Sequence, residues 1–500
     1  MALATSIATP GQSRSFTGAP CVPFHTPASH APPEAAFCCA ARWKRIVRSM
    51  PTQPAAGHTD CGSIALSPRA ANMNDNESLD PAQPHQPATP WLRRLGPGLV
   101  TGAADDDPSG IGTYSQAGAQ FGFELLWVML LTYPLMTAIQ LVSARIGRVT
   151  GKGLASNMRT HYPPWLLYAT VVLLIVANVI NIAADLSAMG AAVGLLLRGP
   201  QELYVVCLGG VSAVLQIFVP YDRYARLLKW IALVLLAYVA VALIVPVRWG
   251  EVGRAIARPH IQFTAAYLTT VIAVLGTTIS PYLFFWQASQ EVEELRAVPN
   301  QGPLRHVPHQ APVQLRRISF DTWVGMGVSN VIAFFITLTA AATLNLHHID
   351  VKTSADAARA LEPVAGHFAY VLFALGIIGT GLLALPVLAG SAAYAAAGTF
   401  RWRNSLALRL GVAPEFYAVI ALAIIGGVAI TFMHFDPIRA LYWSAVINGV
   451  TAAPIMVVMM SMAGSRRIMG KFAVTGALAW GGWLATLAMA IAAIGVLVPG

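Results

Sequence analysis

The stretch TGAADDDPSGIGTYSQAG, residues 101–118, places three adjacent aspartates before a proline and a cluster of glycines. Apolar sequence flanks it on both sides, with LGPGLV before it and the run ELLWVMLLTYPLMTAIQLVSARIG after it. A charged carboxylate near the centre of a bilayer costs at least about 2.5–3.5 kcal/mol, so an aspartate at such a place is usually functional and matched by a cation. The stretch therefore raises the question of which cation these carboxylates serve.

The composition of the chain is that of a membrane protein with many spans. Of its 500 residues, 56% are hydrophobic and 11% charged, and the mean hydropathy is +0.60. Soluble domains carry about 25% charged residues. The net charge of +10 is compatible with nucleic-acid binding, but the basic residues fall in short loops between apolar spans, which is a topology signal and predicts no nucleic-acid partner. The five cysteines show neither metal-ligand spacing nor a disulfide framework.

The chain divides into a polar tail, residues 1–90, and a transmembrane domain, residues 91–500. The tail is rich in Pro, Ala, Ser, Gln and His, which predicts disorder, and it lacks the apolar centre of a signal peptide. A genuine tail and an over-long start both remain open, since Met50 and Met73 offer later beginnings. Eleven apolar spans follow, each near the ~20 residues that cross a bilayer: residues 96–119, 124–147, 165–197, 203–221, 226–248, 267–290, 318–345, 367–398, 415–433, 437–463 and 472–498.

Basic residues follow the alternate loops between these spans. They favour a cytoplasmic N-terminus, a C-terminus outside, and a multi-pass protein of an inner or plasma membrane. The loop 291–317 is then cytoplasmic, and the loop 346–366, which has helical spacing, lies outside. The basic residues of the predicted cytoplasmic segments include Arg93, Arg94, Arg148, Lys152, Arg159, Arg296, Arg305, Arg401, Arg403, Arg466 and Lys471.

Two spans contain helix breakers at matching places. The first reads ADDDPSGIG and the sixth reads LGTTISPYLFF, five spans later, as expected if the two halves are inverted repeats. Paired interruptions of this kind point to the midplane site of a transporter, because unwound backbone is tolerated in a membrane only where it lines a cavity or ligates an ion. The competing interpretation places the three aspartates in an interfacial loop, which leaves residues 96–104 without a membrane partner.

The motifs of the first three spans carry a family resemblance. The segment GPGLVTGAADDDPSGIGTYSQAGAQFGFELLWV, the following QLVSARIGRVTGKGLA, and IAADLSAMGAAVGLLL in the third span closely resemble the Nramp (natural-resistance-associated macrophage protein) divalent-metal transporters. Asn330 and the segment SRRIMGKF extend the likeness over residues 90–498. The resemblance implies an all-α integral membrane protein with the leucine-transporter-like fold: two inverted five-helix repeats plus an eleventh helix.

The chain departs from the family pattern at the metal site. The family's first-helix Asp falls on Asp107, but its Asn falls on Gly110. Its sixth-helix Met-Pro-His falls on Ser280, Pro281 and Tyr282. In the third helix its Asp falls on Asp185, whereas the Glu one turn later falls on Ala188. The resemblance therefore implies a metal site without thioether or imidazole, and fewer of the groups that the family uses to move protons.

The candidate metal shell that remains consists of oxygen ligands. Such shells suit Mg²⁺, Mn²⁺ and Ca²⁺, whereas a thioether favours softer metals. We expect Asp107 to be the central ligand and Tyr282 to close the cavity. The ligand set is Asp107, Asp106, the carbonyls near Ala104 and Thr277, and the hydroxyls of Thr278 or Ser280; Gly110 and Asn448 line the cavity, and Asp185 and Asp105 are candidates for a proton site or a second charged site.

The sequence thus predicts a secondary-type transporter of divalent metal cations, not an enzyme. The metal is its substrate, no cofactor is implied, the lipid bilayer surrounds it, and we expect the monomer to function. Weak discrimination between Mn²⁺ and Mg²⁺ and weak proton coupling follow from the altered residues. Two alternatives stay open. A transporter of the same fold could carry an amino acid or organic cation, because a fold alone does not set a substrate. An intramembrane Mg²⁺-dependent prenyltransferase would need a second Asp-rich motif, which the chain lacks.

Overall fold

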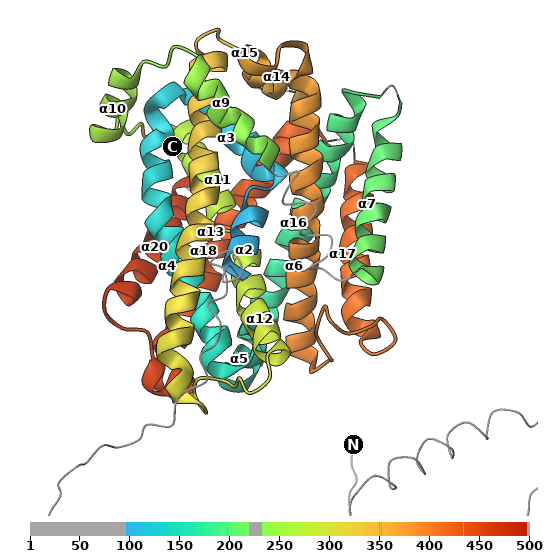
Figure 1. Cartoon of the computed structure of the whole chain (residues 1–500), viewed down its shortest axis with the longest axis vertical. Coiled ribbons are helices and arrows are strands. Elements are labelled where there is room, and N and C mark those ends of the chain that lie inside the picture. The colour runs from blue at the N-terminus through green and yellow to red at the C-terminus, as the bar shows by residue number, and fades with distance from the viewer. Residues whose placement is uncertain are drawn as a thin grey trace, which may run out of the picture. The chain divides into compact units, whose positions relative to one another are not determined.

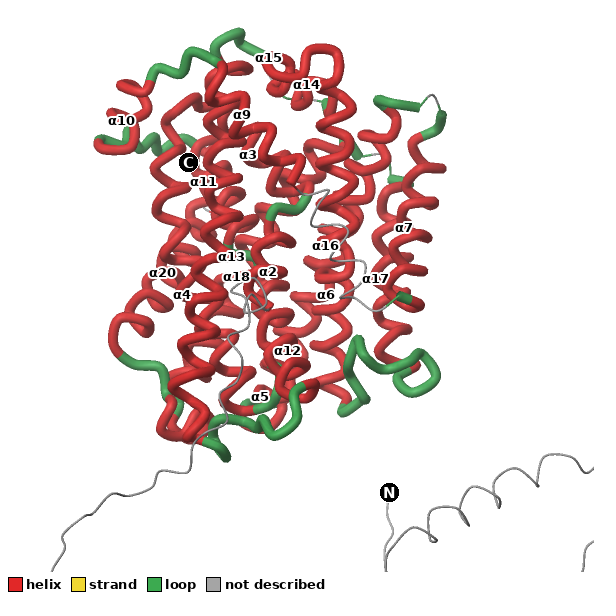
Figure 2. The backbone as a smooth tube through the Cα atoms, viewed as in Figure 1, coloured by secondary structure: helices red, strands yellow, loops and turns green. Residues whose placement is uncertain are grey.

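The structure is a computed structural model that describes residues 97–497 apart from residues 198, 220–232, 350, 352 and 434. Its described residues form helices joined by short loops, and no strand occurs among them. Figure 2 shows the loops gathered at the two ends of a helical bundle. The predicted all-α class is confirmed. The predicted tail, residues 1–90, lies outside the described residues.

The helices follow one another in the order that the apolar spans predicted (Figure 1). Their bounds are α2 (Pro97–Asp105), α3 (Pro108–Phe121), α4 (Leu126–Thr150), α5 (Leu154–His161), α6 (Pro164–Gly194), α7 (Gln201–Phe218), α9 (Leu236–Ile244), α10 (Trp249–Ala257), α11 (Ala265–Thr278), α12 (Pro281–Ala297), α13 (Ala311–Ala340), α14 (Ser354–Ala358), α15 (Glu362–Ala365), α16 (Ala369–Phe400), α17 (Pro414–Thr431), α18 (Pro437–Gly464), α19 (Arg466–Met469) and α20 (Gly476–Leu497).

Nine stretches of helix within the described part are long and apolar enough to cross a membrane, and a bent pair, α9 with α10, raises the number to as many as ten. The count is lower than the eleven predicted spans in part because α3 and α4 are counted together as one stretch of 43 residues, Pro108–Thr150. That stretch is about twice the ~20 residues that cross a bilayer, and its backbone turns at Gly122, where φ is +56°. Residues 220–232, which belong in part to the fifth predicted span, lie outside the described residues.

Both predicted helix breaks are present. The first span separates into α2 and α3 around Asp106 and Asp107, and the sixth separates into α11 and α12 around Ile279 and Ser280. In each case the second half begins with a proline, which has no N–H to leave unsatisfied at the start of a helix and whose φ is already helical. The break positions were therefore readable from the Asp-Pro and Ser-Pro pairs.

Glycines let each broken helix approach its neighbour closely. A Cβ on Gly102 of α2 would lie 2.2 Å from the carbonyl oxygen of Gly325 in α13. A Cβ on Gly276 of α11 would lie 2.1 Å from the carbonyl oxygen of Ala445 in α18. Only a residue without a side chain fits at these distances, as is common where membrane helices pack backbone against backbone. The two breaks are thus held against long, continuous helices.

The loops predicted to be cytoplasmic lie together at one end of the bundle. The backbone N–H of Arg305 donates to the carbonyl of Val149 at 3.2 Å, and its guanidinium donates to the carbonyl of Ile468, also at 3.2 Å. Arg296 donates to the carbonyl of Asn404 at 3.0 Å. The short helices α10, α14 and α15 lie at the opposite end (Figure 1). The helical character predicted for residues 346–366 is confirmed by α14 and α15.

Candidate functional site

The first break presents the carboxylate of Asp107 as the N-cap of α3. Its backbone is extended, with ψ at 171°, and its Oδ1 accepts the N–H of Gly110 at 2.8 Å and the hydroxyl of Ser109 at 2.6 Å. An N-cap aspartate satisfies N–H groups that the start of a helix leaves without partners. The Asp-Pro-Ser-Gly sequence therefore fixes both the break and the direction of the carboxylate.

The other oxygen of Asp107 faces two further helices. Its Oδ2 accepts from Nδ2 of Asn181 in α6 at 3.1 Å and from the hydroxyl of Tyr282 in α12 at 3.2 Å. Asn181 in turn accepts from Nδ2 of Asn448 in α18 at 3.3 Å. All four side chains are almost completely buried. Residues from α3, α6 and α12 thus meet at one carboxylate, and α18 contacts this set through Asn181.

Every donor to Asp107 is electrically neutral. Within the part of the chain that the structure describes, no basic side chain forms a salt bridge with it, and no group of three His, Cys, Asp or Glu side chains could hold a metal ion. A cation at this carboxylate would therefore complete its shell with neutral oxygens. Such a shell is the type that hard divalent cations accept.

The remaining predicted ligands divide into two groups. The Ala104 carbonyl lies near the carboxylate, since the Tyr282 hydroxyl reaches it at 3.5 Å. At Thr277 the predicted carbonyl accepts the Ser280 hydroxyl at 2.9 Å, whereas the Thr277 hydroxyl, which was not predicted, lies 3.4 Å from the Ser109 hydroxyl. The hydroxyls of Thr278 and Ser280 instead donate to carbonyls of their own helix, those of Val274 at 2.9 Å and Gly276 at 2.8 Å. Because both hydroxyl protons are used in these hydrogen bonds, the two hydroxyls could contact an ion only through their oxygen lone pairs.

Asp105 and Asp106 face α13 through a shared donor. The Ser329 hydroxyl lies 2.7 Å from Oδ2 of Asp105 and 3.1 Å from Oδ1 of Asp106. Both carboxylates are buried, and Oδ1 of Asp105 has no hydrogen-bond partner. The three adjacent aspartates thus have two sets of partners: Asp105 and Asp106 share Ser329, and Asp107 faces α3, α6 and α12. Adjacent side chains point in different directions, so one set of partners could not serve all three.

Asp185 and Gly110 complete the set of predicted residues. Asp185 lies one turn after Asn181 in α6, completely buried, and no side chain among the described residues donates to its carboxylate, which interacts with the backbone N–H of Ser109. At Gly110, a Cβ would lie 3.2 Å from the Tyr114 ring and 3.3 Å from the Thr277 hydroxyl. These two side chains occupy the space into which a larger residue at position 110 would extend.

Four polar residues of the site were not predicted as ligands: Ser109, Tyr114, Asn181 and Ser329. The four-residue spacing from Asn181 to Asp185 places them on one helix face and was a usable signal. Ser109 follows the Asp-Pro pair directly, as a residue near a helix cap would. Ser329 had no comparable signal, because a hydroxyl in an apolar helix commonly bonds its own backbone.

Comparisons with known proteins agree on one family. The family model described as natural resistance-associated macrophage protein-like matches residues 98–499. The divalent metal cation transporter MntH of Acidiphilium cryptum is 26% identical over 389 residues, which are 76% of this chain and 84% of the relative. The protein of the same name from Klebsiella pneumoniae is 28% identical over 411 residues, 79% of this chain and 91% of the relative.

Solved structures share the fold. The Eremococcus coleocola manganese transporter, in complex with an aromatic bis-isothiourea substituted compound, gives a TM-score of 0.67 at 18% identity and covers 81% of this chain and 87% of its own. Mhp1, a nucleobase-cation-symport-1 family transporter, gives 0.50 at 13% identity, with 80% and 91% covered. These likenesses confirm the predicted transporter fold, while the relation between the two repeats stays a prediction.

Proposed function

The chain belongs to the natural resistance-associated macrophage protein family, and on that premise we propose that it carries divalent metal cations across a membrane through the break between α2 and α3. The observation that carries the proposal is the buried carboxylate of Asp107. It accepts hydrogen bonds from four neutral donors, and no basic side chain among the described residues forms a salt bridge with it. Burying an unpaired charge is costly, so a cation is the natural partner for it. The names of the relatives, divalent metal cation transporter and manganese transporter, support this class of substrate.

The proposed metal shell starts from Asp107 and the oxygens beside it. Ala104 and Thr277 are the next ligands, because their oxygens already lie within reach of side chains that touch the carboxylate. Asp106 would have to leave Ser329 to join the ion, so we place it after Asp107 in the order of binding. Asn181 and Tyr282 orient the carboxylate through its second oxygen, and Asn448 holds Asn181.

The metal that suits this shell is a hard cation. With Ser280 and Tyr282 at positions where the family motif has a thioether and an imidazole, no soft ligand favours Mn²⁺ over Mg²⁺. A tenfold excess of Mg²⁺ should therefore slow Mn²⁺ uptake measurably. We assign Asp185 as the candidate proton carrier, because a buried carboxyl to which no side chain among the described residues donates is stable only when neutral or paired. Acidification of the vesicle lumen during uptake, abolished by Asp185→Asn, tests that role.

The decisive experiment removes the charge of Asp107 and keeps its cap. Asp107→Asn retains a side-chain oxygen for the Gly110 N–H, since asparagine is as good an N-cap as aspartate. Mn²⁺ uptake into proteoliposomes should fall by more than about 100-fold, because even partners of a metal ligand contribute about 10–100-fold.

The matched control is Asp436→Asn. Asp436 also caps a helix that begins with proline, accepting from the N–H groups of Ile438 and Arg439, but it is exposed at a loop. This variant should transport at the wild-type rate. Undiminished uptake by Asp107→Asn, or equal loss in the two variants, would remove the proposed site.

We propose that the protein lies in an inner or plasma membrane and acts as a monomer. Its N-terminus and the loop 291–317 then face the cytoplasm. The gathering of Arg296, Arg305 and Arg401 at one end supports this orientation through the positive-inside rule. A cysteine at Gln310 should be labelled only from the cytoplasmic side, and a cysteine at Glu362, which is exposed in the loop 346–366, only from the other. Labelling of both from one side would contradict the arrangement.

A further inference from the structure

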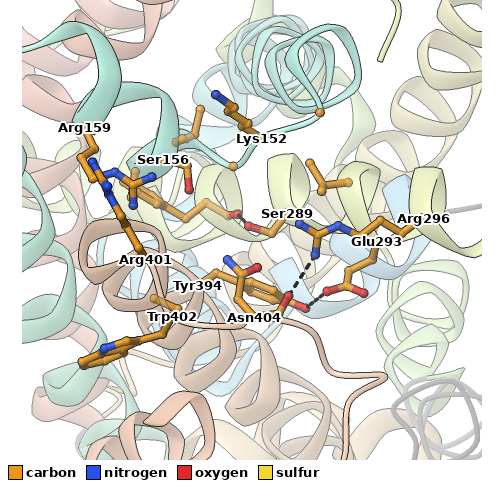
Figure 3. Close-up of a pocket in the computed structure, with 17 residues that line it drawn as sticks. Lys152, Ser156, Arg159, Ser289, Glu293, Arg296, Tyr394, Arg401, Trp402 and Asn404 are labelled. Carbon is orange, nitrogen blue, oxygen red and sulfur yellow. Dashed lines mark hydrogen bonds between the residues drawn. The ribbon is translucent and has the colours of Figure 1, made fainter. Parts of the chain in front are cut away.

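A basic cavity lies at the end of the bundle that we assign to the cytoplasm. It has a volume of about 260 Å³ and is formed by the loop before α5, the middle of α12 and the C-terminal end of α16. Figure 3 shows Lys152, Arg159, Arg296 and Arg401 around it, with Glu293 as its acidic side chain. Four cationic groups therefore share this cavity with one carboxylate.

The single carboxylate of Glu293 lies near Arg296 and offsets part of its charge, but four basic groups outnumber it. Its two oxygens accept the hydroxyl of Tyr394 at 3.0 Å and that of Ser405 at 2.6 Å. None of the four basic side chains forms a salt bridge anywhere in the described ranges. Arg296 and Arg159 donate instead to backbone carbonyls, those of Asn404 and Gly398. Carbonyls satisfy their hydrogen bonds but carry no net charge, so one carboxylate, that of Glu293, faces four cationic groups in this cavity.

Arg159 and Arg401 form a pair of like charges in this cavity. Their guanidinium groups lie beside each other at one side of the cavity (Figure 3). Burial, and then the positive charge of Arg401, lower the pKa of Arg159. Two like charges held together without an acid are unfavourable unless an anion lies between them, and the planar fork of arginine matches phosphate oxygens.

The backbone conformation of Arg401 is a further feature of this cavity. Its φ is +63°, in the left-handed region at the C-cap of α16, where glycine is the usual residue. A non-glycine residue in that conformation is strained, and such strain is found where a side chain serves a function.

The start of α5 adds backbone donors to the cavity. Gly151, Gly153 and the first residues of α5 line it, and the N-cap, Gly153, has no side chain to accept from the free N–H groups of the first turn. The N-terminus of a helix favours an anion through these N–H groups and the helix dipole. In this chain that feature coincides with the four basic side chains.

From these observations we infer that the cavity binds a phosphate group, either of a free phosphate compound in the cytoplasm or of an anionic lipid headgroup. Arg159 and Arg401 hold its oxygens, Lys152 and Arg296 balance its remaining charge, and the first turn of α5 donates N–H groups. Bound there, the anion joins α5 and α16 to α12, the helix whose first turn carries Tyr282. The site is separate from the proposed metal site and depends only on the orientation proposed above for its access to the cytoplasm.

The test measures binding to the purified full-length chain. In neutral detergent, inorganic phosphate is titrated at constant ionic strength, with chloride as the balancing anion, while the thermal unfolding midpoint is followed. In nanodiscs, the midpoint is compared between phosphatidylcholine alone and phosphatidylcholine with phosphatidylglycerol. A ligand that binds only the folded state raises the midpoint in proportion to its occupancy. We expect the wild type to respond in at least one arm.

Three variants assign the response to the cavity. Arg159→Gln/Arg401→Gln should weaken binding by at least about tenfold, since a hydrogen bond to a charged group contributes that much. Lys152→Gln should weaken it less. It guards against misfolding, because the Lys152 side chain is exposed and donates no hydrogen bond among the described residues. Arg403→Gln, exposed on the same loop as Arg401 but outside the cavity lining, is the control and should bind as the wild type does.

The outcomes separate the sources and can overturn the site. A response to phosphate in detergent that the double variant loses supports a free phosphate compound. A response only to phosphatidylglycerol, lost in the same variant, supports a lipid headgroup. No difference between the wild type and the double variant in either arm overturns the inference, as does an equal loss in Arg403→Gln. None of these outcomes depends on metal uptake, so the metal site stands or fails separately.

Discussion

At the first helix break the N-cap side chain is Asp107, and at the second it is Ser280. Each has an extended backbone, with ψ at 171° and 134°, and each is followed by a proline that begins the next helix. The side chains behave differently. Asp107 accepts from α3, α6 and α12, whereas Ser280 donates back to the carbonyls of Gly276 and Thr277 in α11. Proline sets the same backbone at both breaks, and the residue before it decides what the break can bind.

The physical reason lies in what each group can donate. An ionised carboxylate only accepts hydrogen bonds, so it attracts donors, or a cation, from neighbouring helices. A hydroxyl carries a proton of its own and satisfies the carbonyls that an interrupted helix leaves without partners. The first break therefore presents a charge to the interior, and the second break closes on itself.

After the Asp107 variant itself, the largest effect expected from testing this contrast concerns Asn181. Asn181→Ala removes a donor to Asp107 and the acceptor of Asn448. Because partners that orient a metal ligand typically contribute about 10–100-fold to affinity, the concentration of Mn²⁺ for half-maximal uptake should rise by about that factor. Uptake in proteoliposomes over a range of Mn²⁺ concentrations measures it.

Asn178→Ala is the matched control in the same helix. Asn178 donates to the Leu388 carbonyl at 2.9 Å and to the Ser391 hydroxyl at 2.8 Å, both in α16, and makes no contact with Asp107 among the described hydrogen bonds. Its loss should lower thermal stability and leave the Mn²⁺ dependence unchanged. If the two variants shift the Mn²⁺ dependence equally, Asn181 acts through helix packing and the contrast between the breaks loses its support.

The smallest effect is expected at the second break. Ser280→Ala removes a hydroxyl that bonds only to its own helix, so the free energy of unfolding should fall by about 1 kcal/mol. The Mn²⁺ dependence, and the competition by Mg²⁺, should stay within about twofold of the wild type, as for independent sites. A tenfold weaker Mn²⁺ dependence would instead make Ser280 a ligand and remove the asymmetry.

The sequence was sufficient to predict the membrane helices and the two positions at which they are interrupted. Apolar length predicted the spans, and the pairs Asp107-Pro108 and Ser280-Pro281 predicted both interruptions, because a capping residue followed by proline is a helix start. Proline alone was not the signal, since Pro134, Pro386 and Pro454 lie inside continuous helices. The spacing of basic loops anticipated which segments gather at one end. The count of eleven spans stays a prediction, since α3 and α4 form one stretch of 43 residues, about twice the ~20 that cross a bilayer, and residues 220–232 lie outside the described part.

The composition of the shell around Asp107 depended on tertiary structure. Asn181, Tyr282 and Asn448 come from helices far apart in the sequence, and only the packing of α6, α12 and α18 brings them to one carboxylate. The sequence also did not predict how the three aspartates divide between partners. Adjacent side chains point in different directions, and only the packed helices show that Ser329 donates to Asp105 and Asp106.

By itself, then, the amino-acid sequence determined that this chain lies in a membrane, where its helices are interrupted, and that the interruption at Asp107 carries a carboxyl group. These are local properties, set by apolar length, by proline geometry and by the identity of a side chain. Only the tertiary structure decided which donors surround Asp107, that the Ser280 hydroxyl turns inward to its own helix, and that Arg159 and Arg401 lie side by side. Those are contacts between residues up to hundreds of positions apart, and the free energy that selects them belongs to the packing of the whole bundle.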